Sequence, residues 1–173
     1  MKPKRIAVIG PESTGKSELC QSLATHFQTG WVPEVARSYL DSLNRSYEKK
    51  DLKVIAKEQL RLEDKKAEHA KNYLFCDTTL IVLKVWSDHK YGTTDVWIEE
   101  QLIARRYDFY LLNNIDLPWI PDPQREHPAL RKYFFNIYEE YLKAKKLPYA
   151  IVSGKGKERK KCALDALQSR IKD

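Results

Sequence analysis

The sequence lacks a long apolar run. In its 173 residues no hydrophobic stretch approaches the length of a membrane-spanning helix, so we expect no membrane-embedded segment. Residues 1–5 (Met-Lys-Pro-Lys-Arg) lead directly into an apolar stretch, which leaves no room for a signal peptide. The three cysteines, Cys20, Cys76 and Cys162, are scattered and do not have metal-binding spacing. We therefore expect reduced thiols and a cytoplasmic location.

Repeats and low-complexity segments are also absent. Hydrophobic residues make up 42% of the chain and aromatic residues 11%, which excludes disorder, and the length favours a single domain over residues 1–173. The net charge of +7 is compatible with nucleic-acid binding, but in residues 48–57 and 62–71 bases alternate with acids, as on solvated helix faces. We therefore expect no nucleic-acid partner, while a basic mouth would suit an anionic nucleotide. No feature indicates an oligomeric state.

One stretch carries a specific signal, the eight residues from Gly10 to Ser17, Gly-Pro-Glu-Ser-Thr-Gly-Lys-Ser. They match the phosphate-binding loop pattern of Gly, any four residues, Gly-Lys and Ser or Thr. The apolar residues 5–9 before the loop predict a buried strand, and Leu19, Leu23 and Phe27 after it have helical spacing. A loop between a strand and a helix presents backbone N–H groups and a helix N-terminus to an anion. The agreement of strand, loop and helix argues against an ordinary glycine-rich turn.

The loop predicts a nucleoside-triphosphate site with a magnesium ion. In such loops the lysine, here Lys16, reaches the β- and γ-phosphates, and the hydroxyl that follows, here Ser17, ligates Mg²⁺. The loop does not identify the group that receives the phosphate. Evidence for the acceptor must therefore come from the other residues.

Strands and helices alternate along the chain. Strands are predicted at 5–9, 31–32, 74–77, 108–112 and 148–152, with a helix between each pair and one after the last, through Ala163, Leu167 and Ile171. A helix capped by Asp51 is predicted to run to about Asn72, and one opened by Pro128 follows the fourth strand. Residues 80–86 are apolar and ambiguous, but Asp77-Thr-Thr79 just before them favours a helix. The fold class is therefore α/β, with a five-stranded, mostly parallel sheet and helices on both faces.

Two acids follow predicted strands. Glu34 comes after residues 31–32 and stands with Arg37 at a helix start, where its carboxylate either faces a ligand or complements the helix dipole. Asp77 ends the third strand, where it either supports magnesium or caps the next turn. The sequence leaves both alternatives open.

A proline-rich loop is predicted at 113–128, with four prolines from Pro118 onwards. Prolines preset the backbone, so the loop is stiff and shaped. Arg125 in this loop either stabilises a transferring phosphoryl group or pins the loop, and Trp119 either offers an aromatic face or anchors the loop. His127 is interpreted as a helix-start residue and not as a catalyst. The basic residues 155–161, Arg159 included, either border a nucleotide or are solvated, and we slightly favour the latter.

Several motifs together resemble the ribosylnicotinamide kinase domain of the NadR type, within the small phosphate-loop ATPases and kinases. The resemblance covers most of the chain, and its narrowest piece is the loop with Pro-Trp near its start and Asp-Pro-Gln-Arg near its end. The matching pieces are residues 10–17, 32–37 with 39–40, 75–78, 84–87 with 90–92, 107–112 and 116–128.

The resemblance implies a P-loop NTPase of the nucleoside-kinase-like fold, with a lid that contains Arg125. It also implies transfer of the γ-phosphate of ATP to the 5′-hydroxyl of nicotinamide riboside, which gives nicotinamide mononucleotide for NAD salvage. Two positions depart from the pattern. Glu18 stands where the family usually has Thr, whose hydroxyl often touches the α-phosphate, and Asn113-Asn114 replaces a Cys-Asp-like pair. Larger members carry an adenylyltransferase domain and a DNA-binding segment, and we expect only the kinase activity to carry over.

These observations give a candidate site for ATP, Mg²⁺ and a small nucleoside. The expected catalytic groups are Lys16, Arg125, and either Glu34 or Asp77 as general base, with magnesium on Ser17 and Asp77. The residues expected to bind ATP are Gly10, Glu12, Ser13, Thr14, Gly15, Lys16, Ser17, Glu18 and Arg159. The residues expected to bind the nucleoside are Glu34, Arg37, Trp86, Asp116, Trp119 and Asp122. A cationic nicotinamide ring favours an aromatic face beside acids, so Trp119 with Asp116 and Asp122 is the first choice and Trp86 with Asp88 the second.

Two rival functions fit the same loop. The enzyme could phosphorylate another nucleoside or a small alcohol, or the chain could be an ATP-dependent switch or binding module. A stoichiometric phosphorylated product indicates a kinase, and slow hydrolysis without an acceptor indicates a switch.

Overall fold

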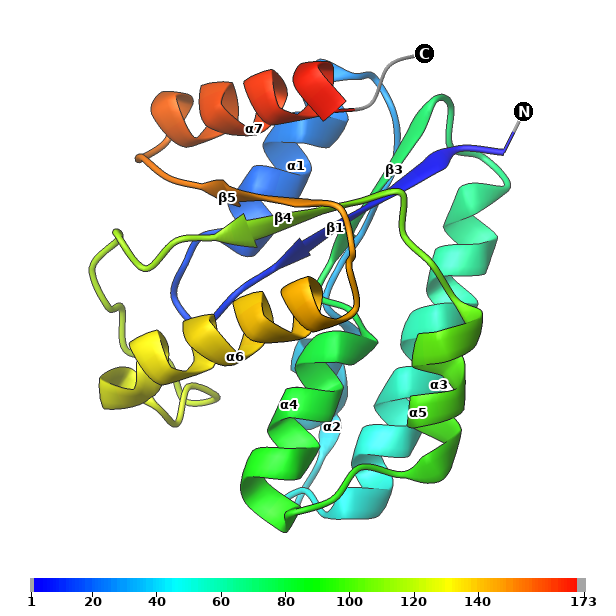
Figure 1. Cartoon of the computed structure of the whole chain (residues 1–173). Coiled ribbons are helices and arrows are strands. Elements are labelled where there is room, and N and C mark those ends of the chain that lie inside the picture. The colour runs from blue at the N-terminus through cyan, green and yellow to red at the C-terminus, as the bar shows by residue number, and fades with distance from the viewer. Residues whose placement is uncertain (1, 171–173) are drawn as a thin grey trace.

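The computed structural model describes residues 2–170 and contains one five-stranded parallel sheet in the order β2-β3-β1-β4-β5 (Figure 1). All five predicted strands are confirmed, and every strand pair is parallel. The strands are β1 (Lys4–Ile9), β2 (Trp31–Val32), β3 (Tyr73–Asp77), β4 (Phe109–Asn113) and β5 (Tyr149–Val152).

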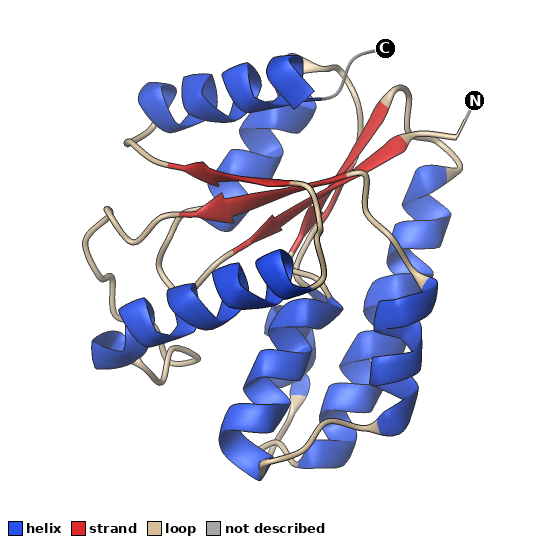
Figure 2. Cartoon of the chain, viewed as in Figure 1, coloured by secondary structure: helices blue, strands red, loops and turns tan. Residues whose placement is uncertain are grey.

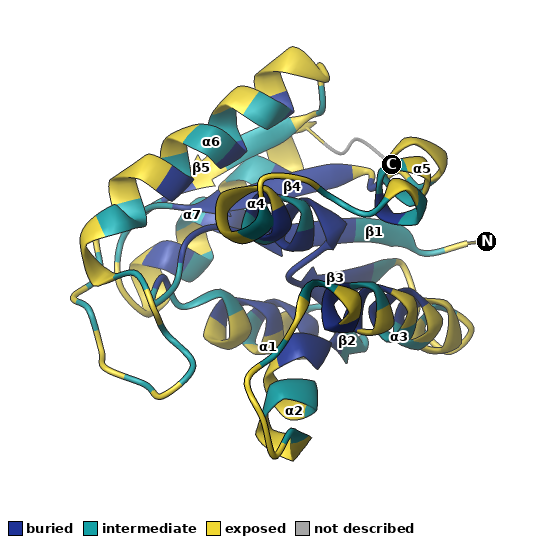
Figure 3. Cartoon of the chain, turned by 90° about the horizontal axis from the view of Figure 1, so that it is seen from below, coloured by how far each residue is buried: buried dark blue, intermediate teal, exposed yellow. Residues whose placement is uncertain are grey.

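Helices cover both faces of the sheet (Figures 1 and 2). Apolar side chains of α1 and α7 pack on one face, and those of α4 and α6 pack on the other. A third apolar cluster joins α2, α3, α4 and α5. The helices are α1 (Lys16–His26), α2 (Val35–Ser42), α3 (Lys49–Ala67), α4 (Leu80–Tyr91), α5 (Val96–Ala104), the 3₁₀ turn η1 (Pro128–Leu130), α6 (Arg131–Ala144) and α7 (Lys157–Arg170). The strands are largely buried between these layers, whereas the outer sides of the helices are exposed (Figure 3).

The strand order brings three carboxyl ends together. β1 lies between β3 and β4, and Val8 pairs with Asp77 while Ile9 pairs with Leu112. The loop that begins at Gly10 therefore emerges between the last residues of its two neighbours. Ligands of open α/β sheets bind at such an edge, where the chain direction switches from one side of a strand to the other.

The ambiguous apolar run is confirmed as helix α4. The Thr79 hydroxyl caps it by accepting a hydrogen bond from the Ile81 N–H at 3.3 Å. Asp95 likewise caps α5, since its carboxylate accepts from the Trp97 N–H at 2.9 Å. For α4, the local capping chemistry therefore identified a helix that apolar periodicity alone did not.

The prediction for α3 is wrong at both ends. Glu48, not Asp51, is its N-cap, and the two form a capping box in which each side chain accepts from the other's backbone N–H. The helix ends at Ala67 and does not reach Asn72. Pro128 opens the 3₁₀ turn η1, and α6 follows directly at Arg131. Ile171, expected in the last helix, lies outside the described residues.

No helix within residues 2–170 is long and apolar enough to cross a membrane, which agrees with the absence of long apolar runs from the sequence.

Replacing Asp51 with Asn should destabilise the protein by roughly 2 kcal/mol, or about 4–8 °C in melting temperature. The buried Asp51 carboxylate accepts from both Arg45 Nη atoms at 2.7 and 2.8 Å, from the Tyr39 hydroxyl at 3.0 Å and from the Glu48 N–H at 2.7 Å. An amide cannot accept all of these hydrogen bonds. Thermal melting at neutral pH measures the loss.

The pH dependence gives a second readout for Asp51. The Arg45 guanidinium holds the pKa of this carboxyl below its usual value, so its stabilising effect is present at neutral pH and is lost as the pH falls below about 4. The difference between variant and native protein should shrink over that range. Asp165→Asn, a change at an exposed acid of α7, is the control. Equal melting of the Asp51 variant and this control at pH 7 would contradict the assignment.

Candidate functional site

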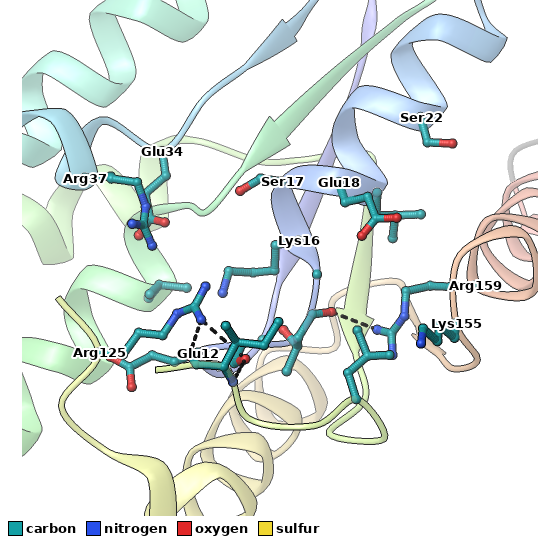
Figure 4. Close-up of a pocket in the computed structure, with 18 of the residues that line it drawn as sticks. Glu12, Lys16, Ser17, Glu18, Ser22, Glu34, Arg37, Arg125, Lys155 and Arg159 are labelled. Atoms are coloured by element: carbon teal, nitrogen blue, oxygen red, sulfur yellow. Dashed lines mark hydrogen bonds between the residues drawn. The ribbon is translucent and has the colours of Figure 1, made fainter. Parts of the chain in front are cut away.

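A cavity of about 770 Å³ lies at the carboxyl edge of the sheet (Figure 4). The loop of residues 10–17 forms its middle. The first turn of α2 and part of α4 line one end, and residues 155–160 line the other end together with the start of α1. Residues 117–125, from the proline-rich loop, line it as well. The volume is within the range that holds small-molecule ligands.

The glycine-rich loop is held by its carbonyl groups. The Thr14 carbonyl accepts from Asn113 Nδ2 at 2.9 Å and from Arg159 Nη1 at 3.0 Å, and the Ser13 carbonyl accepts from Arg131 Nη2 at 3.1 Å. Gly10 has a φ of +144°, and a Cβ there would stand 2.9 Å from the Asn113 carbonyl oxygen, so only glycine fits.

The backbone N–H groups of this loop are free. None of the N–H groups of residues 12–18 donates a hydrogen bond to another residue in the range 2–170. Gly15, at the N-cap of α1, has a left-handed φ of +72°. Free N–H groups at the N-terminus of a helix form a site for phosphate oxygens, as the sequence predicts.

Two proposed magnesium ligands meet beside this loop. The Ser17 hydroxyl donates to Asp77 Oδ2 at 2.5 Å, and Asp77 is only 1% exposed. The second carboxylate oxygen of Asp77, Oδ1, is buried and has no hydrogen-bond partner among the described residues. Thr78, the next residue, has a left-handed φ of +67°, so the backbone is strained where the carboxylate is aimed.

Burial changes the acidity of Asp77. Loss of water, and then the negative charge of Glu34, raise its pKa from 3.8 to about 6, while Lys16 and the Ser17 hydroxyl act in the opposite direction. A cation beside Asp77 would remove this penalty.

Ser17 and Asp77 fit a cation that is held partly by the protein and partly by the phosphate groups of a bound substrate. Among residues 2–170 no group of three His, Cys, Asp or Glu side chains could hold a metal ion alone. Magnesium needs no such group, since it is commonly bound by one or two protein oxygens, phosphate oxygens and water. The Ser17 hydroxyl and the unpartnered Asp77 Oδ1 offer this kind of set.

Glu34, Arg37 and Trp86 line the cavity at the α2–α4 end. Glu34 occupies the N-cap position of α2, but its carboxylate caps nothing there and points into the cavity together with Arg37 (Figure 4). Arg37 donates to Asp122 at 2.8 Å. The Trp86 ring is stacked on Tyr47, with ring centroids 6.0 Å apart and planes 17° apart.

The proline-rich loop lies over the glycine-rich loop. Glu12 accepts from the N–H groups of Glu126 and His127, both at 3.2 Å. Ser13 Oγ accepts from the Ile120 N–H at 2.9 Å. His127 is the N-cap of η1, which agrees with its interpretation as a helix-start residue.

For Arg125 the structure shows the loop-pinning contact, which is one of the two roles that the sequence left open. Its guanidinium donates to the Ile120 carbonyl within its own loop, and Nη1 also lies 3.5 Å from Ser13 Oγ. The side chain lines the cavity beside Lys16, whose Nζ donates to the Pro11 carbonyl at 2.9 Å (Figure 4). Arg125 therefore pins its loop and also lines the cavity near Lys16.

At the other end of the cavity the expectation for Arg159 is corrected. The slightly favoured solvated state is wrong, because Arg159 is 3% exposed and pairs with Asp116. Its Nε donates to the Gly154 carbonyl at 2.8 Å. The residue lines the cavity, but its hydrogen bonds hold the two loops beside it. Its neighbours Lys155, Lys157 and Lys160 also line the cavity.

Three predicted nucleoside ligands do not line the cavity. Asp116 accepts from the Gly154 N–H at 2.6 Å and pairs with Arg159, Asp122 pairs with Arg37, and Trp119 is absent from the cavity wall. Asp88, the partner suggested for Trp86, binds Lys84 and Thr94 and also lies outside the wall. Of the two aromatic candidates, only Trp86 reaches the cavity.

Sequence reasoning missed some residues of the site. Arg131 holds the Ser13 and Leu117 carbonyls, and nothing in its sequence context marks it beyond its place at a helix start. Tyr138, a buried residue of α6, also lines the cavity. Ser22, which lines it too, follows Glu18 by one helical turn, and that spacing was the available signal.

A family model described as an AAA domain matches residues 5–159 of the sequence. The chain belongs to this AAA domain family. Curated relatives include the trifunctional NAD biosynthesis/regulator protein NadR of Salmonella typhimurium LT2 and that of Escherichia coli K12, each 26% identical over 157 residues. The matches cover 86% of this chain and 38% of each relative, so the chain spans well under half of their length. The predicted similarity to the NadR type is thereby confirmed.

Solved structures confirm the fold class of this AAA domain. A NadR protein in complex with NR superposes with a TM-score of 0.80 at 20% identity, over 97% of this chain and 50% of that one. A thymidylate kinase from Ehrlichia chaffeensis gives 0.65 at 12% identity, over 98% and 99% of the two chains. A deoxyadenosine kinase from M. mycoides gives 0.58 at 16% identity, over 95% and 99%. The fold is that of P-loop nucleoside and nucleotide kinases.

Replacing Asp77 with Asn should stabilise the ligand-free protein at pH 7. The pKa of Asp77 is raised on folding, so the native protein loses stability as the pH rises from about 4 to about 6, and an amide carries no such penalty. The change from 3.8 to about 6 corresponds to roughly 3 kcal/mol, or about 6–12 °C in melting temperature.

Thermal melting of both proteins from pH 4 to pH 8 tests this prediction. The gain should be small at pH 4 and reach its full size above pH 6. The exposed Asp165→Asn variant controls for removal of a negative charge. A gain that does not change with pH would show that the buried charge of Asp77 is not its cause.

Proposed function

We propose that this protein is an ATP-dependent nucleoside kinase that phosphorylates the 5′-hydroxyl of nicotinamide riboside and gives nicotinamide mononucleotide. The observation that carries the proposal is a cavity that has the phosphate-loop motif in its middle and Glu34, Arg37 and Trp86 at one end. The curated relatives are described as NAD biosynthesis proteins, and one NadR structure contains NR, which supports this acceptor.

The middle of the cavity would hold the triphosphate of ATP. The free N–H groups of residues 12–18 bind phosphate oxygens, and Lys16 needs only to leave the Pro11 carbonyl to reach the γ-phosphate. Arg125 stabilises the charge that develops during transfer. Ser17 and Asp77 would hold Mg²⁺, which supplies charge neutralisation at the phosphates when it is bound.

Of the two acids considered as general base, we assign Glu34. Asp77 is buried, accepts the Ser17 hydroxyl and does not line the cavity, so we do not assign it as the base and keep it as the proposed support of the cation. Glu34 faces the cavity, and its carboxylate makes no capping hydrogen bond although it occupies the N-cap position of α2. Its carboxylate can therefore orient the 5′-hydroxyl toward the γ-phosphate and accept its proton as the phosphorus–oxygen bond forms.

The acceptor ring would lie on Trp86. Nicotinamide riboside carries a positive ring, and a tryptophan face attracts such a ring by stacking and by cation–π interaction. Trp86 is fixed in place by its stack with Tyr47, so little side-chain freedom is lost on binding. Glu34 on the same cavity wall adds a favourable negative charge.

A competition assay tests the acceptor. Nicotinamide riboside, uridine, adenosine and thymidine are supplied at equal concentrations with limiting magnesium-ATP, and the products are identified by mass spectrometry. We expect nicotinamide mononucleotide to take most of the phosphate. Lys16→Ala is the blank for contaminating kinases, because it removes the charge that reaches the γ-phosphate. If another nucleoside takes most of the phosphate, the fold is right and the proposed acceptor is wrong.

Replacing Trp86 with Ala should raise the KM for nicotinamide riboside about 5- to 30-fold, which corresponds to roughly 1–2 kcal/mol of lost ring contact. The KM for ATP should change little, because Trp86 lies at the acceptor end of the cavity. Steady-state kinetics with each substrate varied in turn measure both constants.

Trp119→Ala is the matched control for this change, since the same residue type is removed from outside the cavity wall. A larger effect on the KM for nicotinamide riboside from Trp119→Ala than from Trp86→Ala would reverse the assignment.

A further inference from the structure

Glu18 directly follows the phosphate-loop pattern, at the position where the family that the sequence resembles usually has Thr. It lies in the first turn of α1, is exposed and lines the cavity. Within residues 2–170 its side chain makes no hydrogen bond or ion pair. Figure 4 shows it on the side of Lys16 that faces Arg159 and Lys155, away from Glu34 and Arg37. The carboxylate therefore belongs to the end of the cavity opposite the acceptor.

The opposite wall at this end is suited to a flat group. Gly156 lines the cavity, and a Cβ at this position would meet no atom within 4 Å. The backbone there is open, and Lys155 and Lys157 stand on either side of it. Arg159 fixes the loop from below through the Gly154 carbonyl. A nucleobase can lie against this open backbone, and Ser22 is another residue of the cavity wall.

The position of the base and of the phosphates sets the position of the sugar. If the free N–H groups at the start of α1 take the phosphates and the open backbone at Gly156 takes the base, the ribose lies between them. Glu18 is the charged side chain that the first turn of α1 presents to this end of the cavity (Figure 4). An ionised carboxylate has no proton to donate to an α-phosphate oxygen, but it accepts hydrogen bonds from hydroxyls.

We propose that Glu18 selects the sugar of the nucleotide donor. Its carboxylate accepts hydrogen bonds from the 2′- and 3′-hydroxyls of a ribonucleoside triphosphate, as acids do in dinucleotide sites. Lys155, Lys157 and Lys160 on the facing wall offset its repulsion of the phosphates. The inference rests on the proposed function only in that a nucleoside triphosphate binds this cavity.

Calorimetric titration without any acceptor tests the proposal on the full chain. The probes are ATP, 2′-deoxy-ATP and inosine triphosphate, each with magnesium. The native protein should bind ATP about tenfold more tightly than 2′-deoxy-ATP, the size expected for one hydrogen bond to a charged group at an exposed site. In Glu18→Thr the ratio of the two dissociation constants should fall to within about twofold. Removal of the negative charge changes the dissociation constants of ATP and 2′-deoxy-ATP by the same factor. A change in their ratio therefore reports on the sugar contact alone.

The exposed Asp165→Asn variant should keep the native ratio, since it removes one negative charge outside the cavity. Equal binding of ATP and 2′-deoxy-ATP by the native protein would overturn the role of Glu18 and leave the kinase proposal standing. A preference for ATP over 2′-deoxy-ATP that remains in Glu18→Thr would also overturn the role of Glu18. A change only in the ratio of ATP to inosine triphosphate would show that Glu18 contacts the base, which also overturns it. Absence of binding by all three nucleotides would overturn both proposals.

Discussion

The Thr14 carbonyl oxygen accepts hydrogen bonds from two side chains on distant parts of the chain, Asn113 at the end of β4 and Arg159 in α7. With this carbonyl and that of Ser13 held by side chains outside the loop, the N–H groups of residues 12–18 stay free. Because the donors come from β4, α6 and α7, the anion site exists only when the sheet and its helices are assembled. The position of the cavity, the burial of Arg159 and the requirement for glycine at position 10 all follow from this arrangement.

Most of the fold could be predicted because its signals are local. β1 runs into the glycine-rich loop and β3 ends in an acid, and Thr79 marks the start of α4 where an apolar run alone is ambiguous. The start of α3 was misplaced for a physical reason. A capping box has an acid or polar residue at both the N-cap and the third helical position. Asp51 occupies the third helical position of α3, but from the sequence alone it was expected at the N-cap.

The candidate site divides in the same way. The phosphate loop and the pairing of Ser17 with Asp77 could be inferred because spacing and strand ends specify them. The burial of Arg159 and the choice between Trp86 and Trp119 could not be inferred from the sequence. They depend on which segments, distant from the phosphate loop in sequence, form the cavity wall. The sequence of a basic run does not reveal whether its side chains are solvated, paired with acids or part of a cavity wall. The same holds for each of the two tryptophans that have acids nearby in sequence.

The proline-rich loop is attached at three points along one cavity. Asp122 pairs with Arg37 at one end, Glu12 and Ser13 hold the middle, and Asp116 pairs with Arg159 at the other. Because one stiff loop borders both ends of the cavity, a ligand that displaced it at one end would also disturb its contacts at the other. Any coupling between two ligands that arose in this way would be reciprocal, since linkage changes both affinities by the same factor.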